Sequence, residues 1–190
     1  KFGNNFLLLT EGFLPAGNKN SNLRFFMDPL DGTLYYVRKK TANPFPVSIA
    51  LSVAEGDNYE DIVAGAIGDI FSGEVWSADK TSATTSSIFG KCEAKENEKH
   101  EPLFQSDFYF IENAKARLKL KNPKNEKYNQ FECQNCGAVS LQLVRVACGE
   151  ADAYIGVAGP STFELCSAYL IIKQAGGYVL SFDNGKELGK

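Results

Sequence analysis

The chain has 190 residues, 44% of them hydrophobic, and a formal net charge of −3 at pH 7. This size and composition predict a globular protein with a substantial core, built as one large or two small domains. The mild acidity disfavours nucleic acid and anionic membranes as partners, because both attract a basic surface. No apolar run approaches the roughly 20 residues of a membrane span and no signal peptide opens the chain, so we expect a cytoplasmic protein.

Short strands separated by turns fill the first half of the chain. We predict strands at residues 5–12, 23–29 and 45–58, and a strand pair within 61–80 around a turn at 71–74. Pro29 cannot donate to a sheet ladder, so the second strand is expected to end there. The pattern indicates an antiparallel sheet.

Beyond a polar connector at residues 90–104, strands and helices alternate. We predict a strand at 107–113, a helix at 137–149, a strand at 152–157, a helix at 161–177 and a hairpin at 178–188. Alternation of this kind is typical of an α/β layer. The sequence therefore predicts an α+β half over 1–104 and an α/β half over 105–190.

The numbers and positions of the cysteines and the histidine limit which covalent and metal sites the chain can form. The five cysteines are an odd number, which disfavours a disulfide framework, and we expect reduced thiols. Cys133 and Cys136 have metal-ligand spacing, but a zinc site needs a second pair of ligands. The one histidine, His100, lies in a polar stretch, which disfavours Ser-His-Asp and Cys-His catalysis.

The stretch "RFFMDPLDGT" carries two acids, Asp28 and Asp31, at the end of a predicted buried strand. Asp, Pro and Gly are common turn residues, so a plain surface turn is one interpretation. Two carboxylates held close together repel each other, however, and a hard cation relieves that repulsion. Their oxygens and the Leu30 carbonyl would suit Mg²⁺, while the N–H groups of Gly32 and Thr33 would suit a phosphate. The motif of haloacid dehalogenases requires an acid where Pro29 stands, which excludes that family.

Several segments, in order along nearly the whole chain, resemble the inositol monophosphatase superfamily of metal-dependent phosphomonoesterases. These are "FFMDPLDGTLYYV" with "PFPVSIALS", "GDIFSGEVWSADK", "GAVSLQLVRVACGEADAYI" and "FELCSAYLIIKQAGG". The C-terminal pattern is most similar to archaeal members, which act on inositol phosphates, fructose bisphosphate or both. The resemblance implies an α/β fold, a layered αβαβα sandwich, with a substrate cleft between its halves. Compared with the family, this sequence starts after the first helical region and stops before the last elements, so we expect either a partial chain or a shortened enzyme.

The resemblance further implies a site for two to three Mg²⁺ ions. Glu11, Asp28 and the Leu30 carbonyl would hold the first ion, and Glu11 could serve a weaker third. The second ion would be held by Asp28, Asp31 and Glu164. Thr33 and Glu11 would orient the attacking water, and no covalent intermediate is needed.

This chain departs from the family pattern at three places. Glu164 stands where aspartate is usual, and it also fits a capping box with Ser161 at a helix start, so a ligand and a cap are both open interpretations. Gly12 replaces a frequent second glutamate. Residues 155–157 lack the acid that grips inositol in animal members, so inositol as the sole substrate is not supported.

The sequence signals for residues that contact the substrate are less specific than those for the metal ligands. Arg38 could touch a second phosphate, although a solvated charge run explains it as well. Gly137 and Ala138, at a helix start, could offer backbone N–H groups to substrate hydroxyls, although tight packing also favours small residues.

We therefore expect hydrolysis of a small polyol or sugar phosphate, namely inositol 1-phosphate, fructose 1,6-bisphosphate or both. One alternative is a phosphatase of 3′-phosphoadenosine 5′-phosphate, and another is a non-catalytic relative with a degraded metal site. The expected partner is a small phosphorylated substrate. A homodimer is common among relatives, but the sequence shows no interface.

Overall fold

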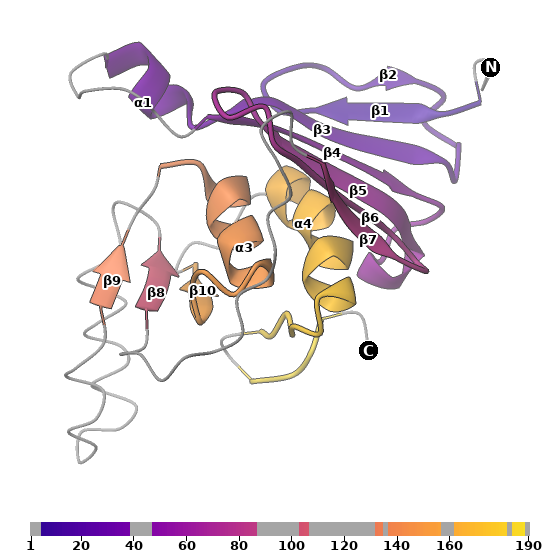
Figure 1. Ribbon diagram of the computed structural model, residues 1–190. Helices are drawn as coiled ribbons and strands as arrows, with labels where there is room; N and C mark the ends of the chain where they lie inside the picture. Colours follow the sequence, from indigo (N-terminus) through magenta and orange to yellow (C-terminus); the bar gives the residue numbers. More distant parts are fainter. Residues whose placement is uncertain are drawn as a thin grey trace.

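The computed structural model describes residues 5–38, 47–86, 103–106, 132–134, 137–156, 162–181 and 184–188. A seven-stranded sheet, with strand order β2-β1-β3-β4-β5-β6-β7, occupies the first part of the chain (Figure 1). Its strands are β1 (Leu7–Thr10), β2 (Ala16–Gly17), β3 (Arg24–Asp31), β4 (Ser48–Ala54), β5 (Ile62–Asp69), β6 (Val75–Asp79) and β7 (Ala83–Ser86). The strands predicted from this part of the sequence are confirmed, and β2 and β7 were not predicted.

The seven-stranded sheet turns one face toward the helices. Along β4, Ser48 and Ala50 are buried while Ile49 and Leu51 are exposed. This alternation follows from the two-residue period of a strand, which sends successive side chains to opposite faces. Helix α4 (Thr162–Gln174) packs on the buried face, against β3, β4, β5 and β6.

Two details of this sheet correct the sequence-based expectation. Strand β1 pairs with β3 in parallel, so the sheet is mixed rather than antiparallel. Strand β3 does not end at Pro29 but continues to Asp31, with a bulge between Asp28, opposite Ala50, and Asp31, opposite Ser48. A bulge leaves residues unpaired, which removes the need for the N–H group that proline lacks.

The bulge has a direct consequence for the two aspartates. Residues three positions apart in a regular strand face opposite sides of the sheet. The extra residue in β3 shifts the register by one, so Asp28 and Asp31 both lie on the buried face, and they are 4% and 6% exposed. The acids therefore point toward the helices instead of into solvent.

Both predicted helices are confirmed, with slightly narrower bounds. Helix α3 (Val139–Ala147) packs beside α4, and α4 ends before Gly176, whose φ of +83° suits a residue without a side chain. Residues 164–172 of α4 are all buried, because the large sheet covers one side and α3 another. The structure adds a short helix, α1 (Thr33–Arg38), and a 3₁₀ turn, η1 (Tyr59–Asp61).

A small parallel sheet completes the layers. Its order is β10-β8-β9, from β10 (Ala153–Ile155), β8 (Leu103–Ser106) and β9 (Glu132–Gln134). Helix α3 contacts β8 and β10, so the helices lie between the two sheets, as Figure 1 shows. This arrangement confirms the predicted layered α/β class, whereas the division at residue 104 stays a prediction.

The remaining expectations concern the end of the chain and one strand. The predicted C-terminal hairpin is present, with a bridge between Leu180 and Glu187. The strand predicted at 107–113 falls outside the described residues. Within the described part of the chain, no helix has the length and apolar character that a membrane crossing requires.

Candidate metal centre

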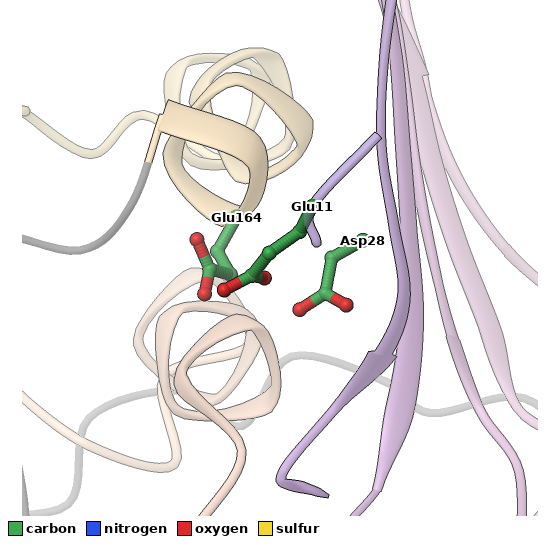
Figure 2. A group of neighbouring side chains, drawn as sticks. All are labelled: Glu11, Asp28 and Glu164. Atoms are coloured by element: carbon green, nitrogen blue, oxygen red, sulfur yellow. The ribbon is translucent and has the colours of Figure 1, made fainter. Parts of the chain in front are cut away.

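Three carboxylates from distant parts of the sequence meet beside the start of α4. Glu11 follows β1, Asp28 lies in β3 and Glu164 is in the first turn of α4. One carboxylate oxygen from each lies within 4.8 Å of the others. Figure 2 shows the three side chains directed toward one another in the space between the strands and the helices. We call Glu11, Asp28 and Glu164 the acidic triad.

The acidic triad is electrostatically unfavourable without a cation. Burial, with the neighbouring charge of Glu11, raises the pKa of Asp28 to about 6, although the Leu30 N–H donates to its Oδ1 at 2.9 Å and opposes the shift. Burial also raises the pKa of Glu164 to about 8, and the negative charges around it add to the effect. A divalent ion would favour the ionised carboxylates, and three carboxylates form the oxygen donor set that Mg²⁺ prefers. The residues therefore fit a magnesium ion.

Asp31 lies next to the acidic triad but is bonded elsewhere. Its Oδ2 accepts hydrogen bonds from the backbone N–H of Ser140 at 2.7 Å and from the Ser140 hydroxyl at 2.5 Å. The Ser48 hydroxyl lies 3.4 Å from the same oxygen. Burial raises the pKa of Asp31, and the hydrogen bonds from Ser140 oppose that shift.

The sequence reasoning missed Ser48 and Ser140. Both are fully buried, and their hydroxyl oxygens lie 2.6 Å apart. The available signal was a lone serine in the apolar run "GAVSLQLV" of a predicted helix, because a buried hydroxyl needs a polar partner.

The loop after β3 contains the predicted phosphate and water-orienting residues. Gly32 has a φ of +89° and turns the chain from β3 into α1. The Thr33 hydroxyl donates to the Leu30 carbonyl at 2.7 Å, and the Thr33 side chain is exposed. With its proton engaged, this hydroxyl is free to accept a hydrogen bond from water. The roles assigned to these residues stay predictions.

The predicted substrate contacts are only partly described. Arg38 is the last residue of α1, and its side chain lies outside the described part. Gly137 has a φ of +95°, and Ala138 is fully buried just before α3. Their contact with a substrate stays a prediction, as does the cap assigned to Ser161, which is outside the described residues.

Gly12, beside Glu11, has a φ of +76°. No atom lies within 4 Å of a Cβ placed there, so space is available. The left-handed backbone would still cost a glutamate at this position about 1–2 kcal/mol.

Comparison with known proteins places these features in a family. A model of the inositol monophosphatase family matches residues 4–189. The Nus factor SuhB of Xylella fastidiosa is 28% identical over 166 residues, covering 86% of this chain and 56% of that protein. The bifunctional NADP phosphatase/NAD kinase of Methanococcus maripaludis is 25% identical over 196 residues, covering 96% of this chain and 34% of that protein.

Solved structures share the fold. The MJ0109 gene product, described as an inositol monophosphatase–fructose 1,6-bisphosphatase, has a TM-score of 0.72 at 21% identity and covers 98% of this chain and 67% of that one. An IMPase/NADP phosphatase complexed with Mg²⁺ and phosphate has a TM-score of 0.70 at 20% identity, covering 94% and 62%. The chain thus spans only part of the curated relatives, 56% of the SuhB protein from X. fastidiosa. It belongs to the inositol monophosphatase family.

Proposed function

We propose that the protein is a magnesium-dependent phosphomonoesterase. The observation that carries this proposal is the acidic triad, in which one carboxylate just after β1, one in β3 and one in α4 converge within 4.8 Å. Buried acids with raised pKa values are costly unless a cation or a proton neutralises them. The named relatives support a phosphate ester as the substrate, because three of them are described as phosphatases.

The proposed roles of the residues follow their positions. Glu11, Asp28 and Glu164 would hold Mg²⁺, with Asp31 and the Leu30 carbonyl completing a site for two to three ions. The ions would supply positive charge that activates water and stabilises the leaving oxygen.

Thr33 would orient that water. Its hydroxyl donates to the Leu30 carbonyl, so water can donate to the Thr33 oxygen and turn a lone pair toward phosphorus. The N–H groups of Gly32 and Thr33 would hold a phosphoryl oxygen.

The proposed substrate is a small polyol or sugar phosphate, with inositol 1-phosphate and fructose 1,6-bisphosphate as the candidates. The alternatives are 3′-phosphoadenosine 5′-phosphate and, from the printed names of two relatives, NADP. Phosphate release from the four compounds, measured side by side at saturating Mg²⁺, separates them. We expect the fastest release from inositol 1-phosphate or fructose 1,6-bisphosphate.

Replacing Asp28 with asparagine tests the chemistry itself. We expect Asp28→Asn to lower kcat at least about 100-fold, because removing one charged group from such a site costs several kcal/mol of transition-state stabilisation. Glu60→Gln removes an exposed carboxylate from the turn η1 and is the matched control, expected to keep the activity. If Asp28→Asn turned over substrate as fast as the wild type, the proposal would be refuted. If the wild-type protein bound Mg²⁺ but hydrolysed no phosphate ester, it would be a non-catalytic relative.

A further inference from the structure

Asp31 is held by a chain of buried hydroxyl groups that comes from two different elements. Ser140 lies in the first turn of α3, and Ser48 is the first residue of β4. Both serines are fully buried, and Asp31 is 6% exposed. The three side chains therefore form one buried chain of hydrogen bonds.

The distances fix the direction of the hydrogen bonds. Each hydroxyl has a single proton to donate. The Ser140 hydroxyl is 2.5 Å from Asp31 Oδ2, so its proton goes to the carboxylate. The Ser48 hydroxyl is 2.6 Å from the Ser140 oxygen but 3.4 Å from Asp31, so Ser48 donates to Ser140. The order is Ser48 to Ser140 to Asp31.

The same carboxylate also caps α3. The residue at the N-cap position, Ala138, has no side-chain oxygen to satisfy the free N–H groups of the first helical turn. Asp31 accepts the Ser140 N–H at 2.7 Å and supplies the missing cap from β3. One carboxylate thus connects the bulge of β3, the start of β4 and the N-terminus of α3.

We propose that Ser140, supported by Ser48, is a positioning residue that holds the Asp31 carboxylate in one orientation beside the acidic triad. This inference rests on the proposed function, because the orientation matters only if Asp31 faces a bound cation. The same bonds connect the start of α3, next to Gly137 and Ala138, to the strand that carries Asp28.

Loss of the Ser140 hydroxyl has a specific expected effect. In Ser140→Ala, the Asp31 oxygen keeps the backbone N–H but loses its shortest hydrogen bond, and the Ser48 hydroxyl loses its acceptor. The carboxylate is then held by the backbone N–H groups of Val139 and Ser140 without the hydroxyl, so its orientation is less firmly fixed. Groups that orient metal ligands typically contribute 10–100-fold to metal affinity, so we expect Mg²⁺ binding to weaken about 10-fold or more.

The test is calorimetric titration of Mg²⁺ into the protein with inorganic phosphate present, for wild type and variants. Ser140→Thr retains the hydroxyl and should restore much of the affinity lost in Ser140→Ala. Ser48→Ala leaves both hydrogen bonds from Ser140 to Asp31 in place, so it should weaken Mg²⁺ binding less than Ser140→Ala does. Ser167→Ala is the matched control, because Ser167 is a fully buried helical serine whose hydroxyl bonds the Phe163 carbonyl of its own helix at 2.8 Å.

Thermal unfolding in a metal chelator, measured on every variant, separates positioning from general destabilisation. Ser140→Ala and Ser167→Ala should both lower Tm, but only Ser140→Ala should weaken Mg²⁺ binding. If folded Ser140→Ala bound Mg²⁺ as tightly as the wild type, the inference would be overturned. An equal loss of Mg²⁺ affinity in Ser167→Ala would also overturn it. In both cases the proposed function would still stand. A wild type that binds no Mg²⁺ would overturn the proposed function and the inference with it. Should Ser140→Ala not fold, Ser140→Cys, which has the same shape with a somewhat larger atom and a much weaker donor, has the same expected loss.

Discussion

At the scale of single residues, the acidic triad makes stability depend on pH. Glu164 has an ordinary pKa of 4.5, which the folded protein raises to about 8, and the pKa of Asp28 is raised to about 6. At pH values between the ordinary and the raised pKa of each acid, the folded state keeps a proton that the unfolded state has lost. The metal-free protein is therefore most stabilised near pH 4–5, and this contribution to the free energy of unfolding is lost as the pH rises toward 8.

We expect the urea midpoint of the metal-free protein to fall between pH 5 and pH 8, with a free-energy change on the order of a few kcal/mol. Urea denaturation in a metal chelator across this range measures the change. Mg²⁺ should restore the midpoint more at pH 8 than at pH 5, because it binds the ionised acids. A midpoint that rises from pH 5 to pH 8 in chelator would contradict the burial of these carboxylates.

Glu164→Gln separates the destabilising effect of the buried charge in the metal-free protein from the contribution of that charge to Mg²⁺ binding. Glutamine has nearly the same shape without the charge, so the metal-free variant should be more stable than wild type at pH 8. It should also gain much less stability from Mg²⁺, because one ligand is lost. Differential scanning fluorimetry with and without Mg²⁺ measures both effects. A variant that gains as much from Mg²⁺ as wild type does would favour the helix-cap interpretation of Glu164.

The motif at β3 was sufficient to suggest Asp28 and Asp31 as ligands, and the family resemblance added Glu11 and Glu164, but neither showed how the four side chains are arranged. The sequence suggested Glu11, Asp28, Asp31 and Glu164 as ligands, and the structure brings three of them within 4.8 Å. The bond between Asp31 and Ser140 joins residues 109 positions apart. Such a pairing depends on how α3 packs against the sheet, and no local pattern encodes that.

At the scale of elements, the contact between β5 and α4 depends on a glycine. A Cβ at Gly65 would lie 2.3 Å from the Ser167 carbonyl oxygen, so the helix backbone can approach only because no side chain is present. At Gly68, in the same strand, the nearest atom would be Val75 Cγ2 at an ordinary 3.8 Å.

We expect Gly65→Ala to lower the free energy of unfolding by about 1–3 kcal/mol, because overpacking forces the helix away from the sheet. Gly68→Ala should leave it unchanged or raise it by up to about 1 kcal/mol, because glycine weakens a strand. Urea denaturation of the two variants measures the difference. Equal effects would show that α4 does not rest on β5 at Gly65.

The elements themselves were largely predictable, because strand and helix periods are local signals. Helix α4 could be predicted from its glycine stop, and β4 from alternation. The parallel pairing of β1 with β3 was not predictable, because register between strands depends on connections rather than on composition. The β3 bulge was missed for a related reason: Pro29 predicts the end of a ladder, and only the partner strand shows that pairing resumes at Asp31.

At the scale of the whole molecule, the acidic triad links both ends of the chain. Asp28 lies in the large sheet and Glu11 just after its strand β1, while Glu164 lies in α4, more than a hundred residues later. A cation bound by all three would stabilise the folded state, since the unfolded chain cannot present them together. At 100 times its Kd, such an ion adds about 2.7 kcal/mol.

We therefore expect Mg²⁺ to raise Tm with a logarithmic dependence on its concentration, and Asp28→Asn to lose most of this rise. Thermal unfolding over a range of Mg²⁺ concentrations measures the effect. An equal rise in Asp28→Asn would place the stabilising ion elsewhere on the protein.

The most direct test is an anomalous-difference map from a crystal grown with Mn²⁺ and phosphate, since Mn²⁺ takes the same oxygen ligands as Mg²⁺. We expect a peak among the carboxylates of Glu11, Asp28 and Glu164, with phosphate beside it. Phosphate bound elsewhere, with no anomalous peak among these three side chains, would contradict it.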